Sequence, residues 1–289
     1  MIKTSPISKI TLEGRDFLVK RDDLFDRYLS GNKYRKLHTL LNTPKENLET
    51  IISYGGTQSN AMLAIAAMCK SKNWNFIYYT KPLNKVMKTQ KNGNFFDALS
   101  LGMNHTEIDA ALYKDFIAGL RVNLLEKSFL IDQGGADRSA EYGMRVLAEE
   151  IRKQNIEVDA ICTPSGTGTT ALYLAKELPE YRVYTVACVG DSSYLKEQMS
   201  ALSEIPNNLI ILEPKKRYHF AKLYPEFLEI QTKLKLEGIE FDLLYAPLMW
   251  QTILEKTEEK ILYVHSGGVS GNVSMYERYQ KKLNAQRRV

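Results

Sequence analysis

The segment "DAICTPSGTGTTAL", residues 159–172, contains the local pattern that decides the fold of this chain. A short apolar run is followed by glycines among small hydroxyl residues, and then by residues with helical spacing. This order predicts a buried strand, a tight glycine loop and the first turns of a helix. Such a unit is typical of α/β folds, in which helices connect parallel strands.

The same alternation of strand and helix patterns continues along the chain from about residue 50. We expect strands in the runs "TIIS", "NFIYYT", "KSFLI", "DAICT", "YTVACV", "LIIL", "FDLLY" and "ILYVH". We expect helices over residues 60–69, 92–101, 139–153, 168–178, 194–202, 247–255 and 272–283. The sequence therefore predicts an α/β fold with mainly parallel sheets flanked by helices.

Composition narrows the class of protein. The 289 residues include 39 Lys and Arg against 34 Asp and Glu, with the charges interspersed. This balance argues against a nucleic-acid partner and is compatible with small anionic ligands. Three widely spaced cysteines predict neither a disulfide framework nor a metal clip, and we expect no metal. Because no apolar run approaches the roughly 20 residues of a membrane span, we expect a cytoplasmic protein without a membrane partner.

Two further loops share the pattern of apolar run, glycines and helix start. They are "SYGGTQSNAM", residues 53–62, and "HSGGVSGNVS", residues 265–274. Ligands of open α/β sheets bind at the carboxyl ends of the strands, where such loops lie, and helix N-termini present free N–H groups to anions. The three loops together therefore predict one composite site for an anionic ligand.

The glycine loop of the opening segment, residues 163–172, allows three interpretations. It can be a structural turn, or a phosphate-binding cup in which glycines let the backbone approach and hydroxyls donate hydrogen bonds. It also fits the G-x-G-x-x-A dinucleotide pattern as Gly166, Gly168 and Ala171, with Asp191 beyond the next expected strand. No Walker sequence follows, because the loop lacks a Gly-Lys-Ser/Thr ending.

Lys33 lies in the run "SGNKYRKL". The ordinary interpretation is a solvated lysine at the start of a basic helix. The alternative is a reactive amine, because Gly31 and Asn32 permit an unusual backbone and the cations of Arg35 and Lys36 disfavour the protonated form of Lys33. A neutral lysine together with a phosphate cup is what pyridoxal phosphate requires, so we expect that cofactor.

Several motifs occur in an order that resembles a known enzyme family. They are "VKRDDL" (19–24), "SGNKYRKL" (30–37), "GGTQSNAM" (55–62), the Ser/Gly/Thr loop and "HSGG" (265–268). The family is that of the D-cysteine desulfhydrases and 1-aminocyclopropane-1-carboxylate deaminases, pyridoxal-phosphate enzymes of the tryptophan synthase β fold type, or fold type II. The resemblance spans nearly the whole chain.

The resemblance implies a two-lobed architecture. Residues 1–45 and 152–289 would form the large cofactor-binding domain, and residues 46–151 the small domain. It also implies a homodimer and a small amino acid as the substrate.

The resemblance further implies roles for individual residues. Lys33 would be the Schiff-base lysine, Asn60 would contact the 3′-oxygen of pyridoxal, and Ser59 would hold the substrate carboxylate and help to move protons. Tyr245 and Tyr224 would be active-site tyrosines. The remaining implied cofactor-binding residues are Ser165, Gly166, Thr167, Gly168, Thr169, Thr170 and Ser266. Ordinary structural roles also remain open, because Ser59 and Asn60 can cap a helix and Tyr245 can be a core tyrosine.

The chain departs from the family pattern at two positions. Ala246 stands where the deaminases have glutamate and the desulfhydrases threonine, and Ser266 stands where the desulfhydrases have threonine. A carboxylate beside the pyridine nitrogen makes the ring a stronger electron sink than a hydroxyl does. Opening a cyclopropane ring requires stronger electron withdrawal by the pyridine ring than expelling a thiol does. Ala246 and Ser266 therefore favour β-elimination.

The expected function is therefore that of a pyridoxal-phosphate-dependent lyase similar to D-cysteine desulfhydrase. It would eliminate a β-substituent from a small amino acid and give pyruvate and ammonia. Three alternatives remain: a 1-aminocyclopropane-1-carboxylate deaminase, a homologue that binds the cofactor without turnover, and a dinucleotide-dependent oxidoreductase.

Overall fold

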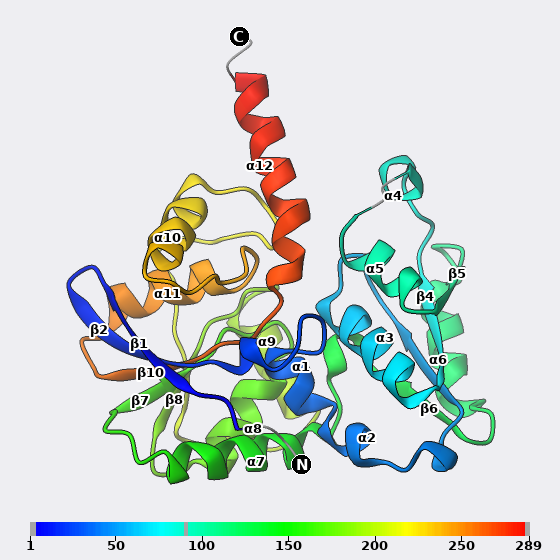
Figure 1. Ribbon diagram of the computed structural model, residues 1–289, viewed down its shortest axis with the longest axis horizontal. Helices are drawn as coiled ribbons and strands as arrows, with labels where there is room; N and C mark the ends of the chain where they lie inside the picture. The colour runs from blue at the N-terminus through cyan, green and yellow to red at the C-terminus, as the bar shows by residue number, and fades with distance from the viewer. Residues whose placement is uncertain (1–3, 90–91, 287–289) are drawn as a thin grey trace.

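The computed structural model describes residues 4–89 and 92–286, which form two bodies side by side (Figure 1). One is built around a six-stranded sheet and the other around a four-stranded sheet. We call them, with the helices packed on them, the large lobe and the small lobe. All neighbouring strands are parallel except β1 and β2, which form an antiparallel hairpin. The predicted α/β class with mainly parallel sheets is confirmed.

The six-stranded sheet has the order β1 (Ile7–Leu12), β2 (Arg15–Lys20), β10 (Ile261–Val264), β7 (Ala160–Cys162), β8 (Arg182–Thr185) and β9 (Leu209–Ile211). The four-stranded sheet has the order β5 (Met103–Glu107), β4 (Asn75–Thr80), β3 (Thr50–Tyr54) and β6 (Ser128–Ile131). Both ends of the chain thus contribute strands to the large lobe.

The α-helices lie between the strands along the chain. They are α1 (Gly31–Lys36), α2 (His38–Asn42), α3 (Asn60–Lys72), α4 (Lys85–Thr89), α5 (Asn94–Ser100), α6 (Tyr113–Val122), α7 (Ala140–Lys153), α8 (Thr169–Glu177), α9 (Ser192–Ser200), α10 (Pro225–Leu236), α11 (Ala246–Lys256) and α12 (Asn272–Gln286). Short 3₁₀ turns occur at Asp22–Leu24, Lys45–Asn47, Gln133–Gly135 and Val269–Gly271. Every expected helix is present, with ends shifted by a few residues.

Helices cover both faces of the large sheet (Figure 1). One apolar core joins the sheet to α10 and α11, and a second joins it to α7, α8 and α9. A third core, in the small lobe, surrounds α3. Because these strands are buried on both faces, their sequences are continuous apolar runs. For this reason the alternation of strands and helices along the chain could be recognised from the sequence.

One expected strand, "FDLLY", is wrong. Asp242 Oδ1 accepts hydrogen bonds from the backbone N–H groups of Leu244 and Tyr245 at 3.0 and 2.7 Å. The N–H of Leu243 is taken by the Asn272 side chain at 2.8 Å. Because side chains satisfy these donors, the segment makes no ladder and instead leads into α11.

The expected domain boundary at residue 151 does not fit the packing. It assigns α7 to the small domain, whereas Met144 and Leu147 of α7 are fully buried in the same core as α8 and β7. Helix α7 therefore belongs to the large lobe, and the chain crosses between lobes just before it. The expected domain ranges also include residues 1–3, 90–91 and 287–289, which lie outside the described residues.

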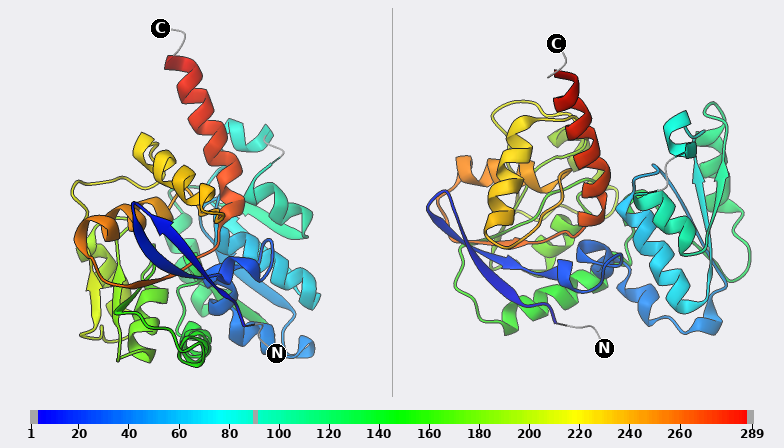
Figure 2. Two further views of the ribbon diagram at one scale, coloured as in Figure 1. Left: turned by 60° about the vertical axis from the view of Figure 1, so that its left-hand side comes forward. Right: turned by 45° about the horizontal axis from the view of Figure 1, so that its top comes forward.

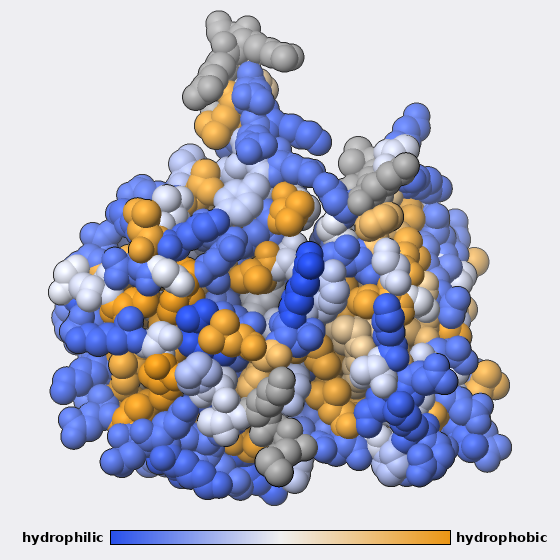
Figure 3. Space-filling model, viewed as in Figure 1, coloured by the Kyte–Doolittle hydropathy of each residue, from blue (hydrophilic) through white to orange (hydrophobic). Residues whose placement is uncertain are grey.

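The two further views show α12 extending away from the body of the large lobe on the side that faces α4 (Figure 2). On the face of Figure 1, hydrophilic residues cover most of the surface and apolar residues form separate patches (Figure 3). Within residues 4–89 and 92–286, no helix has the length and apolar character needed to cross a membrane.

Close packing of α7 on α1 gives a test of the fold. A Cβ added to Gly143 would lie 1.8 Å from the carbonyl oxygen of Arg35. We expect Gly143→Ala to lower the free energy of unfolding by about 1–3 kcal/mol, as overpacking does. Gly119, in α6, is the matched control because an added Cβ there meets nothing within 4 Å. Gly119→Ala should be neutral or stabilising in the same denaturant titration; equal losses for both variants would contradict this packing.

Candidate active site

The three predicted loops meet at a cavity of about 840 Å³ between the lobes. Its inner part adjoins a smaller cavity of about 70 Å³. The residues that line both are Lys33, Asn60, Gly134, Gly166, Thr167 and Tyr245. The outer wall of the larger cavity includes Glu277, Arg278 and Lys281 of α12. The predicted composite site is therefore a single hollow with a narrow end and a wide end.

Helix α1 packs against the third glycine loop, residues 265–274, which follows β10. Gly31 has a φ of +58°, and a Cβ there would lie 2.1 Å from the carbonyl oxygen of Ser266. The Asn32 backbone N–H donates to the same carbonyl at 3.2 Å. Only glycine permits this approach and this backbone. The start of α1, and with it Lys33, is thus fixed against the loop that follows β10.

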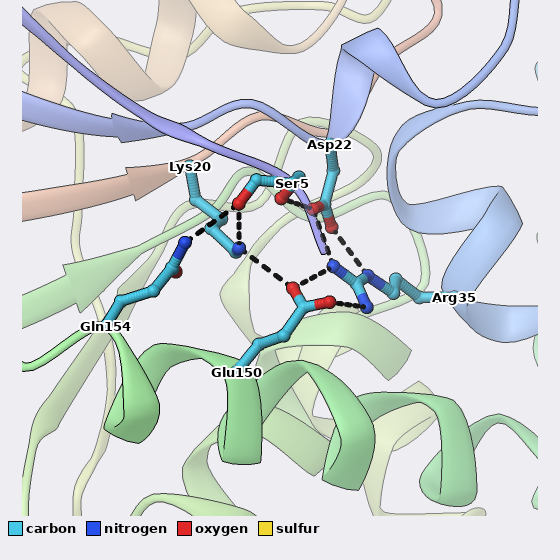
Figure 4. Close-up of polar contacts among 6 residues, drawn as sticks. All are labelled: Ser5, Lys20, Asp22, Arg35, Glu150 and Gln154. Atoms are coloured by element: carbon cyan, nitrogen blue, oxygen red, sulfur yellow. Dashed lines mark hydrogen bonds and ion pairs between the residues drawn. The ribbon is translucent and has the colours of Figure 1, made fainter. Parts of the chain in front are cut away.

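A buried polar cluster holds the other end of α1 (Figure 4). The Arg35 guanidinium pairs with Asp22 at 2.8 Å and with Glu150 at 2.6 Å. Lys20 pairs with the same Glu150 carboxylate at 2.8 Å and donates to the Ser5 carbonyl at 2.6 Å. Two cations and two carboxylates balance, as buried charges require. The cluster joins β2, α1 and α7.

Burial lowers the pKa of Lys33 to about 8, and attraction to the Asp242 carboxylate opposes part of this effect. The direction agrees with the prediction, but burial rather than the neighbouring cations is the main cause. The Arg35 side chain points into its own ion pairs, whereas Lys33 and Lys36 repel each other, and burial together with this repulsion strongly lowers the pKa of Lys36. Lys33 Nζ lies 3.0 Å from the Asn32 side-chain oxygen.

The glycine loop after β7 forms the narrow end of the hollow. Gly168 has a φ of +75°, and a Cβ there would lie 2.3 Å from Met199 Cγ. After this turn the nine-residue helix α8 begins, and its first residues, Thr169 and Thr170, line the small cavity. Two hydroxyls of this loop, those of Thr167 and Thr169, lie 3.0 Å apart, and that of Thr170 accepts from the Asn32 amide at 3.3 Å.

Lys36 is a site residue that sequence reasoning did not select. It lines the small cavity, and its Nζ donates to the Gly134 carbonyl at 3.3 Å. Among residues 4–89 and 92–286, no carboxylate pairs with it, so its buried amine lies beside the first residues of α8 in the small cavity without an acidic partner. Its position three residues after Lys33 on one helix was the available signal. A phosphate dianion fits this donor set.

Ser59 and Asn60 begin α3, and both line the larger cavity. The Ser59 hydroxyl accepts from the Met62 N–H at 3.2 Å, so the helix-capping role is present in addition to the position in the site. The Tyr245 ring lies against Gly166, where a Cβ would be 3.3 Å away, and burial raises its pKa. Ser266 lines the small cavity.

Tyr224 is the one predicted site residue that the structure does not bring to the hollow. Its hydroxyl accepts from the His219 N–H at 2.9 Å, and its ring packs edge-on against Tyr218 at 4.8 Å. Phe220 and Ala221 line the cavity from this segment instead. His265 is a packed residue, with its ring nitrogens 3.0 Å from the Glu240 carbonyl oxygen and the Gly267 nitrogen.

Comparison with known sequences shows which proteins this chain resembles. No family model matches the chain. A Thermotoga maritima protein provisionally named a 1-aminocyclopropane-1-carboxylate deaminase is 29% identical over 89% of this chain and 90% of its own length. The Arabidopsis thaliana bifunctional mitochondrial D-cysteine desulfhydrase/1-aminocyclopropane-1-carboxylate deaminase is 26% identical over 89% of this chain and 73% of its own. In sequence the chain is thus similar to proteins named 1-aminocyclopropane-1-carboxylate deaminases and D-cysteine desulfhydrases.

Solved structures agree on the fold. The crystal structure of a homologue of 1-aminocyclopropane-1-carboxylate deaminase matches with a TM-score of 0.77 at 24% identity, over 93% of this chain and 91% of that one. A pyridoxal 5′-phosphate-dependent aspartate racemase matches with a TM-score of 0.65 at 13% identity, over 92% and 90%. The architecture is fold type II, and the chain is an enzyme similar to these deaminases and desulfhydrases.

The lowered pKa of Lys33 predicts a pH dependence. Its amine is protonated below pH about 8 and neutral above it, and only the neutral amine is a nucleophile. We expect labelling of Lys33 by an amine-reactive reagent, followed by mass spectrometry on the cofactor-free protein, to rise with pH and level off, with a midpoint about 8. The exposed Lys153 provides the comparison. A Lys33 profile that coincides with that of Lys153 would contradict the burial of the amine.

Proposed function

We propose that this protein is a pyridoxal-phosphate-dependent lyase that eliminates a β-substituent from a small amino acid. D-cysteine is the proposed representative substrate, and with water it would yield hydrogen sulfide, pyruvate and ammonia. The observation that carries the proposal is that Lys33, Lys36 and the loop before α8 line one narrow cavity. The family resemblance also supports a two-domain homodimer, and the sequence supports a cytoplasmic location.

The donor set fits the cofactor. Lys36, the α8 N-terminus and the hydroxyls of residues 165–170 would hold the phosphate, and Asn60 and Ser266 would face the ring. When bound, pyridoxal phosphate supplies an aldehyde that condenses with amines and a ring that withdraws electrons from the substrate α-carbon. A phosphate anion would also offset the cost of burying the Lys36 ammonium.

Residues of the chain would then divide the proton transfers between them. Lys33 Nζ, neutral above pH about 8, takes the α-proton. The first N–H groups of α3 and the Ser59 hydroxyl bind the substrate carboxylate at the mouth of the larger cavity. Because burial raises the pKa of Tyr245, its hydroxyl keeps its proton and can donate it to the leaving sulfur.

Ala246 and Ser266 favour elimination over ring opening. Ala246 is fully buried at the start of α11 and brings no carboxylate to the cavity. Ser266 lines the small cavity and offers a hydroxyl, which stabilises a protonated pyridine nitrogen less than a carboxylate does. The 1-aminocyclopropane-1-carboxylate deaminase activity named in the relatives is the second candidate, and a homologue that binds without turnover is the third.

Turnover assays separate these candidates. With D-cysteine, we expect the holoenzyme to form pyruvate and sulfide, and Lys33→Ala to lose at least a thousandfold in rate because it lacks the base. Lys153→Ala, an exposed-lysine control, should retain the rate. Formation of 2-oxobutyrate from 1-aminocyclopropane-1-carboxylate, with no pyruvate from D-cysteine, would favour the deaminase. A visible cofactor band without either product would favour the binding homologue.

A further inference from the structure

Asn94 is a fully buried polar residue that the site described above does not use directly. It begins α5 of the small lobe, behind the loop that leads into α3. Its amide donates to the Gln58 carbonyl at 3.1 Å and to Asn60 Oδ1 at 2.7 Å, and its oxygen accepts from the Ser270 hydroxyl at 3.0 Å. All the polar atoms of this side chain are therefore engaged.

These contacts determine which way the Asn60 amide faces. A backbone carbonyl can only accept, so the Gln58 carbonyl requires the NH₂ group of Asn94 on its side. The second N–H of that group is directed at Asn60, which must therefore present its oxygen. The NH₂ group of Asn60 is left on the opposite side, and Asn60 lines both parts of the hollow. Within the described part of the chain, no acceptor takes a hydrogen bond from Asn60 Nδ2.

The third loop closes on this side chain from the large lobe. A Cβ added to Gly268 would lie 2.4 Å from Asn60 Nδ2, so only a bare backbone leaves room for the amide. Ser270, two residues later, donates to Asn94. Asn94 thus connects a small-lobe residue of the site with a loop of the large lobe. If the Asn60 amide were rotated by half a turn, its NH₂ group would face the NH₂ group of Asn94, and the 2.7 Å hydrogen bond would be lost.

We propose that Asn94 is a positioning residue that fixes the Asn60 amide so that it presents an N–H to an oxyanion on the ring of the cofactor. The inference rests on the proposed function, because the oxyanion would belong to pyridoxal phosphate. It adds a residue that never touches the ligand and that couples the donor to the contact between the lobes through Ser270.

The test is the pH midpoint of the colour change of the bound cofactor. A donor aimed at the ring oxygen favours the form that has lost a proton, so loss of the donor raises the midpoint. We expect Asn60→Ala to raise it by about one pH unit, a tenfold change in that equilibrium. Asn94→Leu should raise it by a large part of that amount, because the Asn60 amide is no longer oriented. The double variant should show no more than the Asn60→Ala shift.

Controls separate positioning from a structural role. Asn104→Ala changes an exposed asparagine of the small lobe and should leave the midpoint unchanged. Thermal unfolding of the cofactor-free variants reports stability alone. If Asn94→Leu lowers the unfolding temperature but keeps the wild-type midpoint, or if the double variant adds the two shifts, the proposal is overturned.

Ser270→Ala keeps the test available if Asn94→Leu does not fold. It removes only the donor to the Asn94 oxygen, and we expect a smaller rise in the same direction. An unchanged midpoint in a folded Ser270→Ala protein would then overturn the coupling. Failure of the wild-type protein to take up pyridoxal phosphate would instead overturn the proposed function, and this inference with it.

Discussion

The buried pairing of Arg35 with Asp22 and Glu150 is the constraint on which the site depends. Helix α1 has only six residues, too few to hold its own geometry, and it carries both Lys33 and Lys36. The Arg35 side chain points away from the hollow into the cluster that joins β2, α1 and α7. Removing one partner from such a group leaves an uncompensated buried charge, at a cost of about 3–5 kcal/mol. The cluster thereby fixes the side of α1 that faces the cavity.

Glycines make the second set of constraints. At Gly31, Gly168 and Gly268 an added Cβ would lie within 2.4 Å of another group, and each glycine has a positive φ. These are the places where α1 meets the third loop, where α8 meets α9, and where the third loop meets Asn60. Three loops from two lobes can enclose one ligand because their backbones touch there. The lysine amines are then desolvated by the enclosure, which lowers the pKa of Lys33 to about 8.

Much of this could be predicted from the sequence, because it depends on local patterns. Continuous apolar runs indicated the buried strands, and the glycine loops indicated the carboxyl edges where the site lies. What could not be predicted depends on partners distant in the chain. Lys36 faces Gly134, 98 residues away, and nothing local marks that contact. "FDLLY" has strand composition, but the side chains of Asp242 and Asn272 take its backbone donors.

In the proposed site, Lys33 is the amine that would bind the cofactor, and Lys36 would bind its phosphate. Peptide mapping by mass spectrometry, after borohydride reduction of the protein with pyridoxal phosphate, tests it most directly. The two lysines are three residues apart on one helix, so fragmentation must resolve them. We predict a single pyridoxyl label on Lys33. A label on Lys36, or labels spread over exposed lysines, would contradict the assignment.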